Sequence, residues 1–540
     1  MDTFQAPVLP LTLGLVILTW VVYRISRIGR RDVGLPPGPP TLPILGNIHQ
    51  FPSQYAHLQF TEWARKYGGI MSLKIASQTL IILSSPSPIR ALIDKGSGIV
   101  ERPRIRLVEI ALDNMNVALV RDGQIWRKMR RAMQMFLTRG ALERYLPIQR
   151  AEAVQLMYYD TLKQPENICS HIERATTSVI LSVAFGIRSP RKVEDDLVSE
   201  FHKTLRMWEL LVQPGGHPPI DMIPILEHIP ERWASWKTRC QEVKQRQQKL
   251  YFGLRDKCQE RVNEDRRNGC FIEDLLDQQQ KLGLNKELIG YIGGDCLEAG
   301  ADTTSKYLSS FVLCIASHPE VQRRAQMDID RVIDSDRVPS IDDIDNLPYV
   351  QAIIKEVHRY QPPLPFAIPH ETTADELIEG LLIPKGSILF MNIYGLYRNP
   401  DFYDAPDQFQ PERFMNSEFG TKPGADISTF RSDFHFGGGK RVCIGDQFAQ
   451  NTIVINVLNL LWAFNFELDD LASRDKTTPL TVKDFAPGLV AGPQPFRCKI
   501  HPRSEVHASL IRSEYQQSRA VLRAFEQELT PEDAKFVEEW

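Results

Sequence analysis

The most informative segment of the chain is a glycine-rich run near its C-terminal end, Phe436-Gly437-Gly438-Gly439-Lys440-Arg441-Val442-Cys443-Ile444-Gly445. Phenylalanine, glycine, arginine, cysteine and glycine at these offsets are expected by chance on the order of 10⁻⁴ times in a chain of this length. A single cysteine is more often a small apolar core residue than a ligand. The glycines, however, allow a tight turn whose backbone N–H groups point at the sulfur, with Phe436 packed beside it. The run therefore predicts that Cys443 binds a metal as a thiolate.

The composition is ordinary for a folded globular protein, because 43% of the 540 residues are apolar and 24% are charged. A net charge of -3 gives no sign of a nucleic-acid partner. Eight cysteines are scattered along the chain without the C-x-x-C spacing of a zinc site or a redox dithiol. We therefore expect the protein to reside in a reducing compartment.

The N-terminus carries a membrane signal. Residues 6–23 contain no charge and are rich in Leu, Val and Ile, which is just long enough for a helix to cross a bilayer. A cleavable secretory signal is the alternative, but no basic residue precedes the segment and no small-x-small site follows it. Four arginines follow the segment within residues 24–31. This asymmetry predicts a single-pass anchor at residues 1–30, with the rest of the chain in the cytosol.

The rest of the chain is predicted to form one large, mainly helical domain at residues 31–505, because no repeat and no long flexible linker divides residues 41–503. The prolines of residues 35–40 form a stiff strap after the anchor. Short strands are expected at residues 70–75, 79–83, 381–383, 387–391 and 497–501. Residues 506–540 are expected to form a helical tail, with Thr530 capping its second helix.

The longest expected helix begins at a cap on Asn285 and ends at His318-Pro319. It contains Gly290, Gly293, Gly294 and Gly300. Each of these glycines costs about 1 kcal/mol relative to alanine, so each needs a structural reason. Close packing against another backbone is one explanation, and room for a flat cofactor or a bound gas is the other.

The run at residues 436–445 resembles the haem-binding signature of the cytochrome P-450 family, in its membrane-bound class. The resemblance extends from the anchor to about Arg503, because the other marks of the family follow in the right order. It implies a mainly α fold with small β-sheets, in which one large helical haem domain follows an N-terminal transmembrane helix. It also implies haem b as cofactor, with Cys443 as the axial ligand of the iron and Arg441 facing a haem propionate.

Two further motifs would meet the haem from other sides. Trp126 and Arg130 have the W-x-x-x-R spacing of the family's C helix, in which both residues contact propionates. The segment Ala299-Gly300-Ala301-Asp302-Thr303-Thr304 resembles the oxygen-activation motif of the I helix. In the family, the glycine leaves space for dioxygen, the threonine hydroxyl serves oxygen activation and the acid delivers protons. A helix cap or a bend caused by Thr303 bonding back to its own helix are the structural alternatives.

The remaining motif belongs to the scaffold. Glu356 and Arg359 have the E-x-x-R spacing of the family's K helix, which puts an acid and a base on one helix face, where they can meet Arg413. His370 occupies the place where many members of the family carry an arginine for a propionate. We expect His370 to contact a propionate, although a histidine at this position departs from the family pattern.

The resemblance implies a haem-thiolate monooxygenase that inserts one oxygen atom of O₂ into a lipophilic small molecule. The sequence is similar to fungal members of secondary metabolism, so a terpenoid or other secondary metabolite is the expected substrate. Electrons are expected from a separate NADPH–cytochrome P-450 reductase, because the chain carries no nicotinamide or flavin motif. A basic face is expected at Arg127, Lys128, Arg131 and Lys440. It would either be the docking surface of the reductase or be merely solvated. The implied location is the endoplasmic reticulum membrane.

Two other functions remain open at the level of sequence. A haem-thiolate isomerase or dehydratase would rearrange an oxygenated substrate without a reductase, but it has less need of the acid and threonine at residues 302 and 303. A non-catalytic haem-binding membrane protein would leave that pair and the basic residues unexplained.

Overall fold

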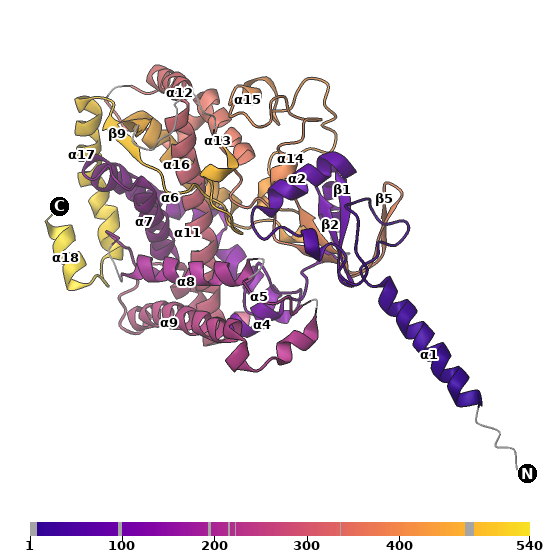
Figure 1. Ribbon diagram of the computed structural model, residues 1–540. Helices are drawn as coiled ribbons and strands as arrows, with labels where there is room; N and C mark the ends of the chain where they lie inside the picture. Colours follow the sequence, from indigo (N-terminus) through magenta and orange to yellow (C-terminus); the bar gives the residue numbers. More distant parts are fainter. Residues whose placement is uncertain are drawn as a thin grey trace, which may run out of the picture.

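The computed structural model describes residues 8–95, 100–192, 196–213, 216–221, 223–334, 336–469 and 480–539. A large helical part lies beside a smaller β-rich part (Figure 1). The helices are α1 (Val8–Arg27), α2 (Ala56–Tyr67), α3 (Pro86–Ile89), α4 (Arg106–Ala111), α5 (Gln124–Phe136), α6 (Arg139–Gln155), α7 (Ile168–Ile180), α8 (Leu197–Val212), α9 (Ser235–Asn263), α10 (Phe271–Leu282), α11 (Lys286–Ser317), α12 (Pro319–Val332), α13 (Pro348–Tyr360), α14 (Ile393–Leu396), α15 (Arg413–Asn416), α16 (Asp446–Ala463), α17 (Glu505–Leu522) and α18 (Pro531–Glu538). The mainly helical fold expected from the sequence is confirmed.

The described strands form three small sheets. They are β1 (Ile70–Ile75), β2 (Gln78–Leu83), β3 (Val100–Glu101), β4 (His370–Thr372), β5 (Glu376–Ile378), β6 (Leu381–Ile383), β7 (Ile388–Met391), β8 (Phe464–Leu468) and β9 (Cys498–Pro502). The largest sheet has the order β1-β2-β7-β4-β3, while β5 pairs with β6 and β8 with β9. The two strands expected around the turn at residues 384–386 belong to different sheets, because β6 pairs with β5 and β7 runs parallel to β2.

The long helix α11 runs through the helical part, and its first half belongs to one of the two largest apolar clusters and its second half to the other. It begins as expected, because the side chain of Asn285 accepts a hydrogen bond from the Leu288 N–H at 2.8 Å. At Gly290, Gly293 and Gly294, a Cβ atom would lie only 2.3–2.5 Å from an aromatic ring of a neighbouring helix. Close packing therefore explains these three glycines, although the partner is a side chain and not a backbone.

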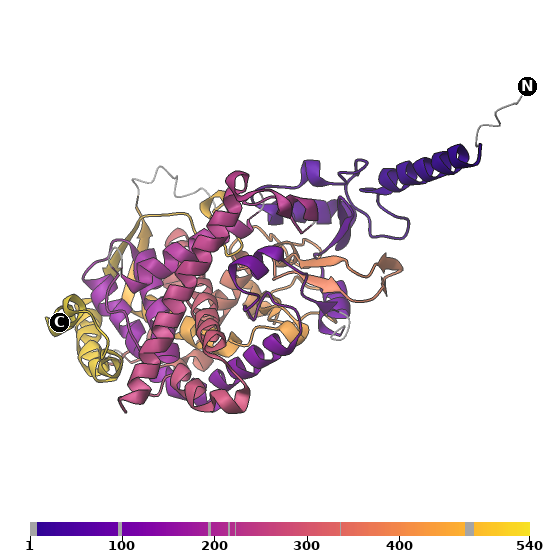
Figure 2. The same ribbon diagram turned by 90° about the horizontal axis from the view of Figure 1, so that it is seen from below.

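The N-terminal helix α1 projects away from the rest of the molecule in both views (Figures 1 and 2). Leu13, Leu15 and Val16 on this helix are each more than 60% exposed. Ala6 and Pro7, at the start of the expected membrane span, lie outside the described residues. Within the part of the chain that the structure describes, no helix meets the length and apolarity needed to cross a membrane, so the expected span is not confirmed.

The tail after Arg503 forms α17 and α18, which lie along one edge of the helical part (Figure 1). Thr530 caps α18 as expected, because its hydroxyl accepts a hydrogen bond from the Asp533 N–H. The tail is docked on the domain through an ion pair of 2.7 Å between Glu526 and the buried Arg188. The tail thus supplies an acidic partner to the buried Arg188.

Candidate haem site

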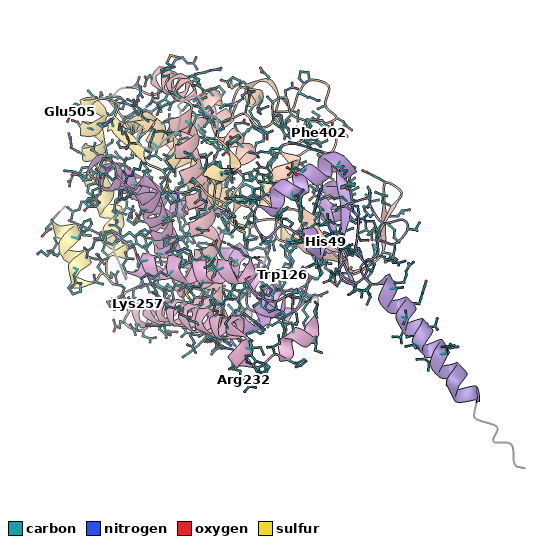
Figure 3. All side chains as sticks on the ribbon, viewed as in Figure 1. His49, Trp126, Arg232, Lys257, Phe402 and Glu505 are labelled. Atoms are coloured by element: carbon teal, nitrogen blue, oxygen red, sulfur yellow. The ribbon has the colours of Figure 1, made fainter. Side chains whose placement is uncertain are left out.

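A cavity in the interior brings together the segments singled out by their motifs. It is lined by α5, α11 and α16, by residues 363–370 and by residues 436–445, which we name the cysteine loop. Trp126 of α5 is labelled in Figure 3 near the middle of the molecule, where the helical and β-rich parts meet. Residues 299–304 of α11 form one side of the cavity and the cysteine loop forms another. Such a space suits a flat cofactor held between a helix and a loop.

The cysteine loop has the tight turn that its glycines predict. Gly437 and Gly439 have φ angles of +79° and +59°, a region that side chains other than glycine rarely adopt. The turn closes through a hydrogen bond of 2.9 Å from the Cys443 N–H to the Phe436 carbonyl. At Gly439, a Cβ atom would lie 2.3 Å from the Ile93 carbonyl oxygen. Both the positive φ angle and this lack of space therefore exclude a larger residue at Gly439.

Cys443 lines the cavity and its side chain is exposed there, although protein atoms surround it densely. Burial is the main reason that its pKa is raised to about 11, while the Gly445 N–H and the Arg130 guanidinium act in the opposite direction. A neutral thiol is therefore the stable form of this side chain without a metal. The thiolate needs a positive partner such as iron, and the Gly445 amide and Arg130 are placed to support it.

Several buried donors at one side of the cavity lack an acceptor. In the part of the chain that the structure describes, Trp126 Nε1, His370 Nδ1 and Arg441 Nε are buried without a hydrogen-bond partner. Unpaired buried donors are costly, so together they indicate that an anionic group belongs among them. The propionates of a haem are such anions. The residues present therefore fit the cofactor that the sequence implies.

The other contacts of these residues hold them in place. Arg130 donates to the Val442 carbonyl at 2.8 Å, and the Arg441 guanidinium lies 4.0 Å from the centre of the Trp126 ring. Arg441 also forms an ion pair of 2.6 Å with Glu101. This acid was not expected from the sequence, and it neutralises part of the positive charge that would face a propionate.

Arg102 is a site residue that the sequence did not reveal. It is buried, lines the cavity and donates to the carbonyls of Ile368 and Pro369 at 2.6 and 2.8 Å. Its Nη1 lies 3.2 Å from Nε2 of His370, on β4. The Arg102 guanidinium therefore lies beside His370, the position at which many members of the family carry an arginine. Nothing in the local sequence separates this loop arginine from a solvated one.

The α11 motif is divided between the cavity and the protein interior. Gly300 and Thr303 line the cavity, as does Thr304, and the Thr303 hydroxyl donates to the Ala299 carbonyl of its own helix at 2.6 Å. At Gly300, a Cβ atom would lie 2.5 Å from the Ile180 side chain, so packing as well as space accounts for this glycine. Because α11 continues on both sides, a helix cap at these residues is excluded.

Asp302 does not line the cavity. Its Oδ1 lies 3.8 Å from the Lys306 Nζ, and its Oδ2 is buried without a hydrogen-bond partner among the described residues. Burial raises the pKa of this carboxyl above its ordinary value, although Lys306 acts against that shift. The structure therefore places Thr303 and Asp302 on successive residues but does not bring both to the cavity.

The scaffold trio forms as predicted. Arg359 makes an ion pair of 2.7 Å with Glu356, and Arg413 approaches the same carboxylate at 3.2 Å. Glu356 and Arg359 are almost completely buried. Arg359 also donates to backbone carbonyls within residues 397–408, and Glu356 accepts from the Gln410 N–H, so the trio holds residues 397–410 in place.

The expected basic face is partly neutralised. Arg127 and Lys440 both pair with Asp122, at 2.9 and 3.1 Å. Lys128 donates to the Gly283 carbonyl at 2.5 Å, and Arg131 is exposed. The positive charge of this face is therefore smaller than a count of its basic residues implies.

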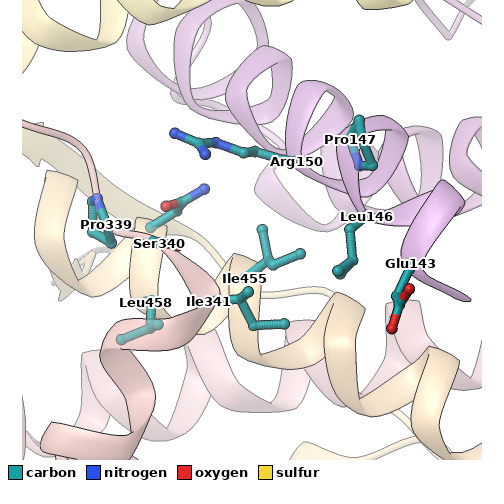
Figure 4. A pocket seen from close by; sticks show the side chains of 10 residues that line it. Glu143, Leu146, Pro147, Arg150, Pro339, Ser340, Ile341, Ile455 and Leu458 are labelled. Atoms are coloured by element: carbon teal, nitrogen blue, oxygen red, sulfur yellow. The ribbon is translucent and has the colours of Figure 1, made fainter. Parts of the chain in front are cut away.

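A second pocket of about 320 Å³ lies between α6, α16 and residues 339–341 (Figure 4). Its charged lining residues are already engaged elsewhere, because Glu143 pairs with Arg139 and Arg150 pairs with Glu514 of the tail. It holds none of the residues expected from the sequence to act in catalysis.

Comparison with known proteins agrees with the geometry of a haem-thiolate site. A family model for Cytochrome P450 matches residues 36–500. A cytochrome P450 monooxygenase of Armillaria gallica is 42% identical, over 96% of this chain and 98% of its own. Monooxygenases of the same name from Rhodocybe pseudopiperita and Aspergillus niger are 34% and 33% identical, over 92% and 93% of this chain and 94% and 95% of theirs.

The chain therefore belongs to the cytochrome P450 family, whose members are oxidoreductases that use haem b. The expected enzyme class and cofactor are confirmed. The match begins after α1 and ends before α17, so the boundaries at residues 30 and 505 remain predictions.

Proposed function

We propose that this monooxygenase holds its haem iron through Cys443 and inserts one oxygen atom of O₂ into a lipophilic small molecule. The observation that carries the proposal is the position of Cys443. Its thiol opens into a cavity that Thr303 lines from α11, and unpaired buried donors stand at the side of the same cavity.

The haem, when bound, supplies the activation of dioxygen, which consumes two electrons and two protons. The protein supplies the thiolate of Cys443 and fixes the cofactor through its propionates. Arg130 and Arg441 are assigned this orienting role because both line the cavity. Trp126 is assigned it because its ring packs against Arg441 and its buried Nε1 has no partner among the described residues. His370 shares it, with Arg102 at its side.

The residues of α11 are assigned to oxygen binding and proton delivery. Thr303 lines the cavity, and its hydroxyl donates a hydrogen bond to a carbonyl of its own helix. The hydroxyl can exchange this carbonyl for a ligand or a water molecule. Asp302 is the neighbouring acid, and burial raises the pKa of its carboxyl above the ordinary value. Because Asp302 does not line the cavity, its proton reaches Thr303 through water or after rotation of the carboxyl group.

The substrate is proposed to be a terpenoid or other secondary metabolite of low polarity. Support comes from the apolar part of the cavity lining, which includes Ile180, Ala299, Leu364, Ala367 and Ile368. A largely apolar pocket with few polar groups binds ligands mainly by burying apolar surface. The relatives from Armillaria gallica and Rhodocybe pseudopiperita are fungal monooxygenases, which agrees with this class of substrate.

Electrons are proposed to come from NADPH–cytochrome P450 reductase. The chain has no nicotinamide or flavin motif, so a separate protein must supply them. Arg131 and Lys128 offer positive charge on α5, whereas Asp122 compensates Arg127 and Lys440. A weak, transient contact of an acidic partner suits such a surface.

The protein is proposed to be tethered by residues 1–30 to the endoplasmic reticulum membrane, with its catalytic domain in the cytosol. Support comes from the exposed apolar side chains of α1, which project from the domain, and from the basic residues that follow. An apolar helix standing free in water would be unfavourable, so it needs a lipid or protein partner.

Turnover with added reductase tests the proposed function. The full-length protein in lipid vesicles is incubated with NADPH, reductase, ¹⁸O₂ and an extract of candidate secondary metabolites. A monooxygenase forms a product that carries ¹⁸O and requires both NADPH and reductase. A haem-thiolate isomerase or dehydratase would convert its substrate without reductase, and a non-catalytic haem protein would form no product. Either result would contradict the proposal.

A further inference from the structure

Residues 112–120, which we name the wall segment, connect α4 to α5 and contribute Val117 and Ala118 to the lining of the cavity. The segment has no regular secondary structure, and Asp113 and Asn114 adopt φ angles of +49° and +58°. Apart from glycine, Asp and Asn are the residues that adopt such angles most readily. An irregular segment of this kind keeps a single conformation only if neighbouring elements hold it.

Asp295, one turn before Ala299 on α11, contacts the wall segment through both carboxylate oxygens. Oδ1 accepts a hydrogen bond from Asn116 Nδ2 at 2.8 Å, and Oδ2 accepts one from the Val117 N–H at 2.7 Å. The Asn116 side-chain oxygen is engaged by N–H groups of its own segment at 3.1 and 3.2 Å. Turning over the Asn116 amide would break these bonds, so the donor toward Asp295 is well defined.

Burying Asp295 is costly. Its side chain is only 5% exposed, and burial together with the nearby Glu298 raises the pKa of its carboxyl well above the ordinary value. In the described ranges of the chain, no lysine, arginine or histidine forms an ion pair with it. A buried acid without a cation contributes less to stability than an apolar side chain of similar size would. The two hydrogen bonds to the wall segment offer a reason for an acid at this position.

We propose that Asp295 is a positioning residue that sets the shape of the substrate pocket by fixing Val117 and Ala118 at the cavity. The wall segment is held from the opposite side as well, because the Ala118 carbonyl accepts from Arg102 at 2.8 Å and the Val117 carbonyl lies 3.4 Å from Arg441 Nη1. The segment therefore spans the distance between α11 and the arginines assigned to the haem. The inference rests on the proposed function only in requiring a haem in the cavity.

Two nitrogen ligands of haem iron that differ in size test this assignment. Full-length protein loaded with haem is titrated with imidazole and with 4-phenylimidazole, and binding is followed by the Soret shift. The variants are Asp295→Asn, Asp295→Ala and Asn116→Ala. The matched control is Glu298→Gln, because Glu298 lies on the same helix but accepts from Gln247 at 2.7 Å and not from the wall segment.

Asp295→Ala should leave the Kd of imidazole within about twofold and raise that of 4-phenylimidazole about tenfold, since two hydrogen bonds to the wall segment are lost. Asn116→Ala should give the same selective loss in smaller measure, and combining the two should give less than the product of the single effects. Glu298→Gln should affect both ligands equally. A second acid, Asp113, still holds the wall segment through Gln248 at 3.0 Å, so the variants should keep their haem.

Equal changes for both ligands in the Asp295 variants, or independent effects of Asp295→Ala and Asn116→Ala, would overturn the inference. Should Asp295→Ala lose haem, the same comparison is made with two other variants. Asp295→Asn keeps nearly the same side-chain volume, and Asn116→Ala lies outside α11. A parent protein that shows no Soret shift with imidazole would instead contradict the haem proposal itself.

Discussion

Replacing Thr303 by alanine removes the hydroxyl and the γ-methyl group of a side chain that lines the cavity. This hydroxyl donates one hydrogen bond, to the Ala299 carbonyl at 2.6 Å, and that carbonyl lies within a continuous helix. Such a bond contributes about 0.5–1.5 kcal/mol. Alanine is more favourable than threonine in a helix by up to about 0.7 kcal/mol. The free energy of unfolding should therefore change by less than about 1 kcal/mol.

The effect on catalysis should be much larger. With reductase and NADPH, the amount of product per NADPH consumed should fall at least about tenfold, because a positioned group for proton transfer is lost. NADPH consumption should continue, and the missing product should be replaced by hydrogen peroxide. The assay measures NADPH, hydrogen peroxide and product in the same sample, beside the haem spectrum and the thermal midpoint.

Ser305→Ala is the matched control. Its hydroxyl also bonds back to α11, to the Asp302 carbonyl at 2.9 Å, but Ser305 does not line the cavity. Thr304 is less suitable because it also lines the cavity. Coupling that stays intact in Thr303→Ala, or that falls equally in Ser305→Ala, would refute the assignment of Thr303. Collapse in Thr304→Ala alone would transfer the role to that residue.

Three further results are expected. Deleting residues 1–30 should release the protein from membranes while haem binding persists, and full retention in pellets washed with alkaline carbonate would contradict a single tether. Glu526→Ala should lower the free energy of unfolding by about 1.5–3 kcal/mol because the buried Arg188 loses a charged partner. The control Glu514→Ala, at an exposed pair, should lower it by less than about 1 kcal/mol. Equal losses of the two variants in urea unfolding would contradict this prediction. Burial raises the pKa of Glu209 to about 8, so its neutral form is stable in the folded state and stability should fall between about pH 4.5 and 8. Glu209→Gln should flatten that part of the pH profile of unfolding and stabilise the protein at pH 8, and an unchanged profile would show that the group ionises freely.

The sequence predicted the parts of the site that depend on local spacing. The cysteine loop, the cap at Asn285 and the trio of Glu356, Arg359 and Arg413 involve fixed offsets or helix faces, and all have the geometry expected. Local rules are sufficient there because the residues concerned are near one another in the chain or on one face of a helix. The glycine turn at Gly437 is specified in the same way.

Contacts between distant segments could not be predicted. Glu101 and Arg102 join the site from the two-residue strand β3 and the position after it, where the stretch is too short for a periodicity that would mark a residue as buried. The strands at residues 381–383 and 388–391 were found in different sheets, because strand pairing depends on partners elsewhere in the chain. The orientation of Asp302 away from the cavity depends on Lys306 and on the packing of α11 against its neighbours. A single sequence contains no direct record of these contacts.

The most direct test of the central claim is the absorption spectrum of the reduced protein with carbon monoxide. Thiolate ligation through Cys443 should place the Soret band at about 450 nm, whereas histidine ligation would leave it at about 420 nm. Cys443→Ser should abolish the band at the longer wavelength, and Cys498→Ser, which changes a cysteine of β9 away from the cavity, should retain it. A band that persists in Cys443→Ser would show that Cys443 is not the ligand of the iron.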